Sequence, residues 1–143
     1  MKQLLIIIIP ILLLMNCNVE PQDINYGSDA CSYCKMNIVE KKFGAEIVTQ
    51  KGKVYKYDAI ECMVNAIESF GQKKIKYFMA IDYNNPTNLI DATTSFHLKS
   101  ENISSPMGAF LSSYSSKENA EKAQDLNGGK IYSWEILKDK FSN

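Results

Sequence analysis

The feature that most restricts the fold is an alternating stretch, FGAEIVTQKGKVYKYD, at positions 43–58. In its first half, residues that favour strands recur at every second position, and its second half is rich in valine and tyrosine. Both patterns are typical of β-strands. Lys51-Gly52-Lys53 separates the halves and is suited to a tight turn. The stretch is therefore predicted to be a β-hairpin.

A helix and a strand are predicted to follow this hairpin. Asp58 and Glu61 have the spacing of a capping box, which opens a helix by satisfying its first backbone N–H groups. Apolar residues then recur at helical spacing until Gly71, so a helix is expected over 59–70. The segment IKYFMAID at 75–82 is rich in β-forming residues and is predicted to be a buried strand.

The second part of the chain has a parallel order of elements. They are one or two short strands within 89–98, a strand at 109–114, a helix at 116–126 opened by Ser115 and Glu118, a strand at 130–134 and a short helix at 135–141. This order predicts an α+β fold with two similar ββαβ-like halves, each with a small, mainly antiparallel sheet and one helix.

The N-terminus has the pattern of an export signal. Lys2 precedes an apolar run, LLIIIIPILLLM, at 4–15, which is shorter than the roughly 20 residues of a membrane-spanning helix. The run ends in LMNC, which resembles a bacterial lipobox in which Cys17 is lipidated. The alternative is that Cys17 is incidental and an ordinary signal peptidase cuts nearby.

These patterns divide the chain into three parts. Residues 1–16 are predicted to be a lipoprotein signal peptide, and 17–29 a lipidated cysteine with a flexible, polar tether. The folded domain is expected over 30–143. The resulting localisation is the extracytoplasmic, periplasmic side of a bacterial membrane, where the domain is held by its lipid anchor.

Charge and motifs limit the classes of function. The chain carries 16 basic and 16 acidic residues, which gives no electrostatic case for a nucleic-acid partner. No Ser/His/Asp set, phosphate loop or acid–base motif stands out, so the protein is not expected to be an enzyme. A monomer is the expected state.

The sequence CSYCKM at 31–36 is the strongest chemical motif. Thiolate and thioether sulfurs are soft donors that suit Cu(I), and a thioether is a poor zinc ligand. In an extended segment the side chains of Cys34 and Met36 would point the same way. Met107, between Pro106 and Gly108 in a polar loop, is the candidate for a third ligand.

Other interpretations of these sulfurs stay open. Cys31 and Cys34 could form a structural disulfide or a redox pair, which would make the protein a thiol–disulfide redox lipoprotein. Zinc lacks a second Cys-x-x-Cys pair. Met36 and Met107 could simply fill space in the fold.

The sequence also predicts the positions or roles of three further residues. Cys62 lies among small and apolar neighbours on the predicted helix and is expected to be a buried structural cysteine, with the alternative that its thiol reaches the other two. His97 is flanked by Phe96 and Leu98, so its side chain should point outward from its strand. Asp58 is expected to cap the helix rather than bind a metal.

The motifs together resemble the NosL family of copper-binding lipoproteins. The resemblance is carried by YCKM (33–36), YDAIECM (57–63), LIDA (89–92), SPMGAF (105–110) and NGGKIYSW (127–134), in this order after the lipoprotein signal. It implies a metallochaperone that binds one Cu(I) through one cysteine and two methionines, here Cys34, Met36 and Met107. It also implies a paired ββαβ fold.

The resemblance also suggests partners and marks two departures. It implies delivery of copper to nitrous oxide reductase or to the transporter machinery that assembles its copper centres. Cys31 completes a Cys-x-x-Cys pair that only part of the family has, so it is either a fourth ligand or a partner that oxidises with Cys34. Lys35 stands where a glycine is common in the family.

Overall fold

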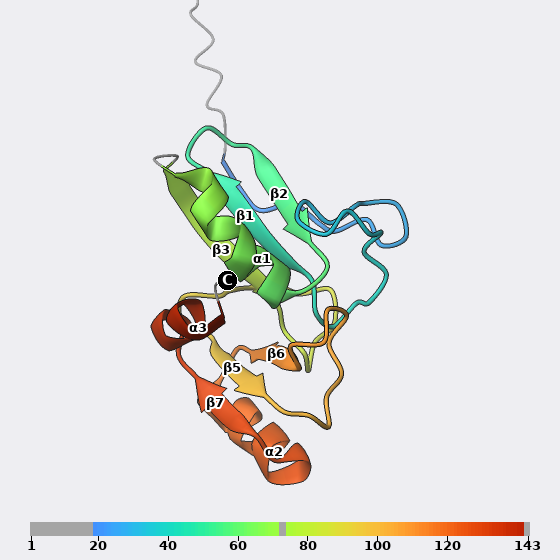
Figure 1. Ribbon diagram of the computed structural model, residues 1–143, viewed down its shortest axis with the longest axis vertical. Helices are drawn as coiled ribbons and strands as arrows, with labels where there is room; N and C mark the ends of the chain where they lie inside the picture. The colour runs from blue at the N-terminus through green and yellow to red at the C-terminus, as the bar shows by residue number, and fades with distance from the viewer. Residues whose placement is uncertain (1–18, 72–73, 142–143) are drawn as a thin grey trace, which may run out of the picture.

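The computed structural model describes residues 19–71 and 74–141. The predicted signal peptide and Cys17 lie outside the described residues. Two small antiparallel sheets, of four and three strands, are arranged one above the other with helices packed on them (Figure 1). Within the described residues, no helix combines the length and apolar character needed to cross a bilayer.

The first half of the chain forms the four-stranded sheet. Its elements are β1 (Ala45–Thr49), β2 (Val54–Tyr57), α1 (Ile60–Ala66), the 3-10 helix η1 (Ile67–Phe70), β3 (Ile75–Ile81) and β4 (Leu89–Asp91). The strand order is β2-β1-β3-β4. The predicted hairpin is present, with Ala45 opposite Tyr57 and Val48 opposite Val54. Both faces of β1 are covered, because all five of its residues are buried.

The second half forms the three-stranded sheet. Its elements are β5 (Phe96–Lys99), β6 (Leu111–Tyr114), α2 (Lys117–Asn127), β7 (Lys130–Tyr132) and α3 (Trp134–Phe141). The strand order is β6-β5-β7. In each half the first strand is central, the second pairs with one edge, and the strand after the helix pairs with the other edge. The predicted α+β fold with two similar ββαβ halves is therefore confirmed.

Two helix starts differ from the capping boxes expected from the sequence. The N-cap of α1 is Ala59, in an extended conformation and with no side-chain cap bond, so the prediction that Asp58 caps this helix is wrong. Asp58 is buried instead, and its Oδ1 has no hydrogen-bond partner. The N-cap of α2 is Ser116, whose Oγ accepts from the Asn119 N–H at 3.2 Å, while Ser115 donates to Asp82.

Residues 19–29 lie against the first sheet. Ile24 is buried in the main core, and the Gln22 N–H donates to the buried carboxylate of Glu46 at 3.1 Å. Lys56 of β2 forms an ion pair with Asp29 at 2.7 Å. The packed structure therefore begins before Ala30, where the sequence places the start of the domain. A polar composition concealed this, because Ile24 is the one buried apolar residue of 19–29 and only the partly buried Tyr26 packs on the same core beside it.

One core joins the two halves and fixes their loops relative to each other. It combines residues of the first sheet and α1 with Leu111, Tyr132, Trp134 and Leu137 of the second half. The Trp134 ring packs against Phe78 of β3, with 5.0 Å between ring centroids. The loop between β5 and β6 is consequently held beside the start of α1, and this placement matters for the metal centre described below.

His97 lies in this interface, contrary to the outward position expected from the sequence. It is fully buried on β5. Its Nε2–H donates to the Ala92 carbonyl at 2.9 Å, and Nδ1 accepts from Ser113 Oγ at 3.0 Å. The alternation rule placed it opposite Phe96 and Leu98, but the far face of this sheet is covered by Trp134. Burial lowers the pKa of His97 to about 4, so the ring is neutral.

Candidate metal centre

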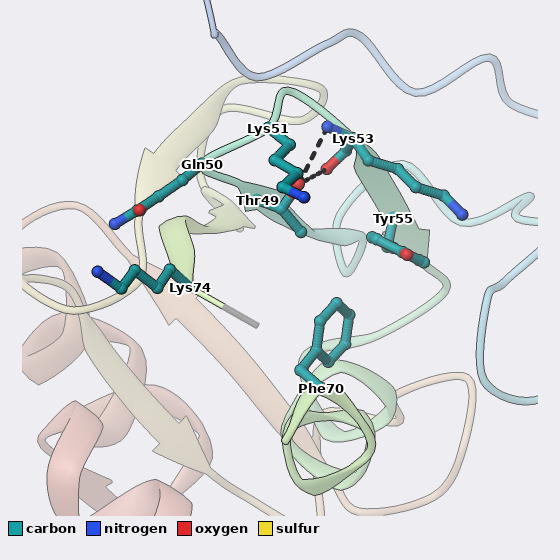
Figure 2. Close-up of a pocket in the computed structure, with 7 residues that line it drawn as sticks. All are labelled: Thr49, Gln50, Lys51, Lys53, Tyr55, Phe70 and Lys74. Atoms are coloured by element: carbon teal, nitrogen blue, oxygen red, sulfur yellow. Dashed lines mark hydrogen bonds between the residues drawn. The ribbon is translucent and has the colours of Figure 1, made fainter. Parts of the chain in front are cut away.

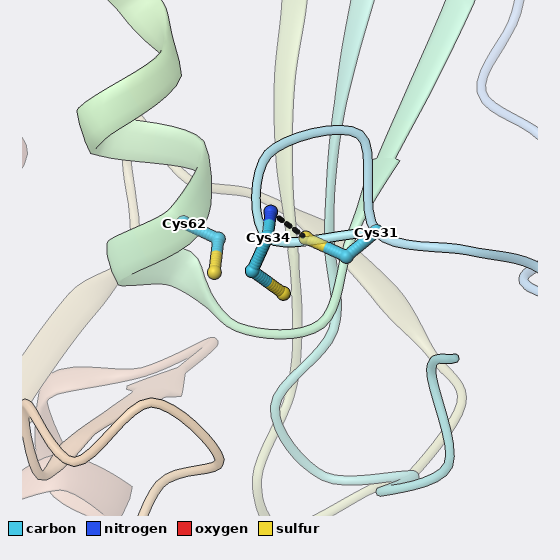
Figure 3. A group of neighbouring side chains, drawn as sticks. All are labelled: Cys31, Cys34 and Cys62. Atoms are coloured by element: carbon cyan, nitrogen blue, oxygen red, sulfur yellow. Dashed lines mark hydrogen bonds between the residues drawn. The ribbon is translucent and has the colours of Figure 1, made fainter. Parts of the chain in front are cut away.

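Three cysteine sulfurs converge at the end of β2 and the start of α1. The Sγ atoms of Cys31, Cys34 and Cys62 all lie within 4.8 Å of one another. Cys31 and Cys34 come from the loop before β1, and Cys62 comes from the first turn of α1 (Figure 3). All three are free thiols. Among the residues that the structure describes, these three cysteines form the one group of three or more His, Cys, Asp or Glu side chains that could hold a metal ion.

A tight turn, rather than an extended segment, presents the first two cysteines. The Cys31 N–H donates to the Met36 carbonyl at 2.8 Å, and the Lys35 N–H donates to the Cys31 carbonyl at 3.0 Å. Lys35 has a φ of 68°. The extended geometry expected for Cys34 and Met36 is therefore wrong, because a left-handed residue between them reverses the chain.

Backbone contacts tie this turn to the first sheet. The Ser32 N–H donates to the carbonyl of Lys56 in β2 at 2.8 Å. The bridge between Ala30 and Asn37 closes the turn at its base. Because β2 leads directly into α1, the same short stretch of sheet places both the turn and Cys62.

Hydrogen bonds concentrate negative charge on one of the three sulfurs. The Cys62 thiol donates to Cys31, and this is the largest of the effects that lower the pKa of Cys31. Peptide N–H groups add to it, including that of Cys34 at 3.5 Å. The pKa of Cys62 is raised, chiefly by this bond to Cys31, and that of Cys34 is raised, chiefly by burial. Cys31 is thus the sulfur that gives up its proton most readily, and a bound cation can replace the protons of the two neighbouring thiols as well.

Cys62 is a member of the cluster and was not among the expected ligands. It is buried, as expected, with 1% of its surface exposed. However, its thiol bonds to Cys31 rather than sitting among apolar groups only. Its place one turn into a helix gave no sign of this contact. The sequence signal for a shared site was the count of three cysteines after Cys17, because an odd number cannot all pair within the chain.

The two methionines lie on the exposed side of the centre. Met36 is 48% exposed and Met107 is 41% exposed, which is unusual for methionine. Met36 follows Cys34 in the turn, and its N–H bonds to the Cys34 sulfur. Met107 lines a cavity of about 470 Å³ together with Tyr33 and Cys62. The loop that carries Met107 therefore opens onto the same side of α1 as the sulfur cluster.

His97 takes no part in this centre. Both of its ring nitrogens are occupied by Ala92 and Ser113, and burial keeps the ring away from solvent. The ring instead joins β5 to Ala92 and to β6.

A second cavity, of about 640 Å³, lies at the other end of β2 and has a different chemical character (Figure 2). Its walls include the rings of Tyr55 and Phe70, which meet edge to face with 4.9 Å between centroids. Lys51, Lys53 and Lys74 line its rim. Its lining residues include no sulfur, histidine or carboxylate, so it lacks the sulfur and nitrogen donors that bind copper or zinc.

The left-handed conformation of Lys35 predicts that glycine at this position stabilises the fold. A side chain costs about 1 kcal/mol in this region, and glycine avoids that cost. Lys35→Gly is therefore expected to raise the free energy of unfolding by up to about 1 kcal/mol, measured by urea unfolding of the reduced protein. Lys41→Gly is the matched control, because Lys41 is not among the residues with positive φ. An equal or lower stability of Lys35→Gly than of wild type would contradict the prediction.

Comparison with known proteins identifies the family and supports the fold. The sequence matches the profile of the NosL family over residues 23–141. Among solved structures, the fold is similar to the crystal structure of the copper chaperone NosL from Shewanella denitrificans, with a TM-score of 0.70 and 21% identity, over 87% of this chain and 97% of that chain. No curated protein matches the sequence. The family profile covers most of the chain, including the cysteine turn, α1 and the Met107 loop, and the protein therefore belongs to the NosL family.

Proposed function

We propose that this protein is a membrane-anchored, extracytoplasmic metallochaperone that carries one Cu(I) ion. The observation that carries the proposal is the convergence of the Cys31, Cys34 and Cys62 sulfurs within 4.8 Å, beside a cavity that Met107 lines. In this proposal Cys34, Met36 and Met107 hold the ion, and Cys31 is the fourth ligand.

The types of donor atom favour monovalent copper over other cargo. Thiolates suit both Cu(I) and zinc, whereas exposed thioethers beside them add affinity for Cu(I) alone. Thioethers also stay uncharged at any pH and do not form disulfides, which suits an oxidising compartment. The single histidine is buried and occupied, so it does not contribute a nitrogen ligand that would favour zinc.

The difference in exposure suggests how the ion is released. Cys31 and Cys62 are buried behind the site, whereas Met36 and Met107 face solvent. A partner protein can approach the exposed thioethers and replace them one at a time with its own ligands. The thiolates then hold the ion until the last exchange, so that free copper is not released.

A thiol–disulfide redox function is less well supported by the same geometry. A nucleophilic cysteine of that class combines a lowered pKa with exposure to solvent. Here the cysteine with the lowered pKa, Cys31, is fully buried, and the more accessible Cys34 has a raised pKa. The pair also lies in a turn instead of at a helix N-terminus.

The proposal also includes a recipient for the copper ion and a lipid anchor at Cys17. Membership of the NosL family supports nitrous oxide reductase, or the transporter machinery that assembles its copper centres, as the recipient. The Cys17 lipobox supports attachment to the periplasmic side of a bacterial membrane. A lipid anchor would keep a monomeric carrier close to exported apo-enzyme.

Metal titration of the reduced protein tests the proposal. Under anaerobic conditions with a competing Cu(I) chelator, wild type should bind one equivalent of Cu(I) and retain it against excess Zn²⁺. Met36→Leu and Met107→Leu should each weaken Cu(I) binding. Met79→Leu is the matched control, because Met79 lies within β3, away from the cysteine turn. Equal Cu(I) affinity of all three variants and wild type would show that the thioethers are not ligands, and preference for Zn²⁺ would identify another cargo.

A further inference from the structure

Glu61 is a buried carboxylate that the metal centre does not require as a ligand. It lies beside Cys62 in the first turn of α1, and only 4% of its surface is exposed. A charged side chain is rarely buried to this extent unless other groups are arranged around it. The groups arranged around Glu61 come from the loop that carries Met107.

The contacts with this loop involve both side-chain and backbone groups. Ser105 Oγ donates to Glu61 Oε1 in a short hydrogen bond. Burial raises the pKa of Glu61, and the Ser105 hydroxyl and the peptide N–H groups of Ala109 and Met107 oppose this rise. The second oxygen, Oε2, is buried and makes no direct hydrogen bond. The Met107 loop is therefore folded around a carboxyl group supplied by α1.

Ser105 connects this carboxyl group to the rest of the loop. While its hydroxyl donates to Glu61, the same oxygen accepts from the Phe110 N–H at 2.9 Å. The Ser105 carbonyl accepts from the Gly108 N–H at 3.0 Å. Gly108 and Phe110 both have positive φ, at 75° and 60°. Glycine adopts this conformation readily, whereas phenylalanine needs support from its surroundings. The position of Met107 consequently depends on the contact between Ser105 and Glu61.

We propose that Glu61 is a positioning residue that holds the Met107 loop over the cysteine cluster, so that the thioether of Met107 reaches the bound ion. This inference rests on the proposed function, since it assumes that Met107 is a ligand. Glu61 and Cys62 are adjacent on one helical turn, so the same turn of α1 presents a sulfur to the cluster and a carboxylate to the loop. Without the carboxylate, the loop loses the acceptor around which it is folded.

Nuclear magnetic resonance of the methionine methyl groups tests this role directly. The full-length reduced protein, labelled with ¹³C at its methionine methyls, is titrated with Cu(I) alone. In wild type, the methyl signals of Met36 and Met107 should both shift. In Glu61→Leu and in Ser105→Ala, the Met36 shift should persist and the Met107 shift should be lost. Outer contacts of this kind change metal affinity by roughly 10–100-fold, and Cu(I) affinity should fall within that range.

Controls separate positioning from a general loss of structure. Glu68→Leu is the matched control, because Glu68 is an exposed carboxylate in η1 and should leave both shifts unchanged. Ser105→Ala removes one hydroxyl only, so it keeps the test valid if Glu61→Leu does not fold. A Met107 shift equal to that of wild type in Ser105→Ala would overturn the role of Glu61. Absence of both methyl shifts in wild type would instead overturn the thioether ligands of the proposed function.

Discussion

Substitution of Cys34 by serine is expected to lower the affinity for Cu(I) by more than about 100-fold. Changes outside the ligand set cost roughly 10–100-fold, so loss of a ligand should exceed that range. Cys34 is the most accessible of the three clustered thiols, and its sulfur accepts from the N–H of the exposed Met36. Serine keeps the size of the side chain but replaces a soft sulfur with a hard oxygen, which binds Cu(I) poorly.

The measurement is competition with a Cu(I) chelator of known affinity under anaerobic conditions. Cys62→Ser belongs in the same series, because its sulfur lies within 4.8 Å of Cys34 and Cys31 and donates to Cys31. Its effect should be at least as large as that of an outer contact, roughly 10-fold or more. If Cys34→Ser binds Cu(I) as tightly as Met79→Leu does, the ion is not held at this cluster.

Replacement of His97 by glutamine is expected to destabilise the fold by roughly 2–4 kcal/mol at pH 7.5. The neutral ring satisfies the Ala92 carbonyl and the Ser113 hydroxyl at once. The glutamine amide carries its nitrogen and oxygen at the tip of a flexible chain, in positions that differ from those of the two ring nitrogens, and does not reach both. Each buried group that loses its partner costs about 1–3 kcal/mol. Urea unfolding of the reduced protein measures the difference.

The pKa of His97 predicts how the stability difference between wild type and His97→Gln depends on pH. Burial lowers the pKa of His97 from its ordinary value of 6.5 to about 4 in the folded protein. Above pH 6.5 the ring is neutral in both states, and its stabilising contribution is complete. As pH falls from 6.5 to 4, the unfolded chain gains the proton first, so the contribution is lost progressively. The loss should approach about 3 kcal/mol.

Comparison with the glutamine variant isolates this effect from other titrating groups. Glu46 and Asp58 titrate in the same range, since burial raises their pKa values to about 7 and about 6. They are common to both proteins and cancel in the difference. The stability advantage of wild type over His97→Gln should shrink between pH 7.5 and pH 4. A difference that is independent of pH would mean that the pKa of His97 is the same in the folded and the unfolded states, which would contradict the prediction.

The regular elements of the fold were predictable because their periodicity is local. The alternation of 43–58 specified the hairpin, and the helical spacing after Asp58 specified α1. The order of elements then gave the two ββαβ halves. Cap positions were displaced by one residue, because the spacing of a capping box does not say whether its first side chain turns toward the helix. Asp58 turns into the protein instead.

The metal centre was predictable only in part, because it depends on contacts between distant segments. Residue type alone showed that Cys34 and Met36 carry soft donor atoms. It did not show that the chain turns at Lys35, between them. The inclusion of Cys62 depends on how the turn docks on β2, which no local pattern encodes. The burial of His97 depends on Trp134, which is far along the chain and packs over the same face of β5.

The role of residues 19–29 shows a related limit of sequence reasoning. Their composition is polar and has no periodicity, which is typical of a tether. In the structure they pack on the first sheet through Ile24 and through backbone contacts to the side chains of Glu46 and Lys56. A segment held mainly by its backbone leaves little trace in its side-chain pattern.

X-ray absorption at the copper edge tests the sulfur-bound Cu(I) centre most directly. The protein loaded with one equivalent should show the edge energy of Cu(I) and a first shell of sulfur atoms only. Met36→Leu and Met107→Leu should each reduce the sulfur count, and Met79→Leu should not. A first shell of nitrogen or oxygen, or a sulfur shell that neither methionine substitution changes, would contradict the assignment of Cys34, Met36 and Met107 as ligands.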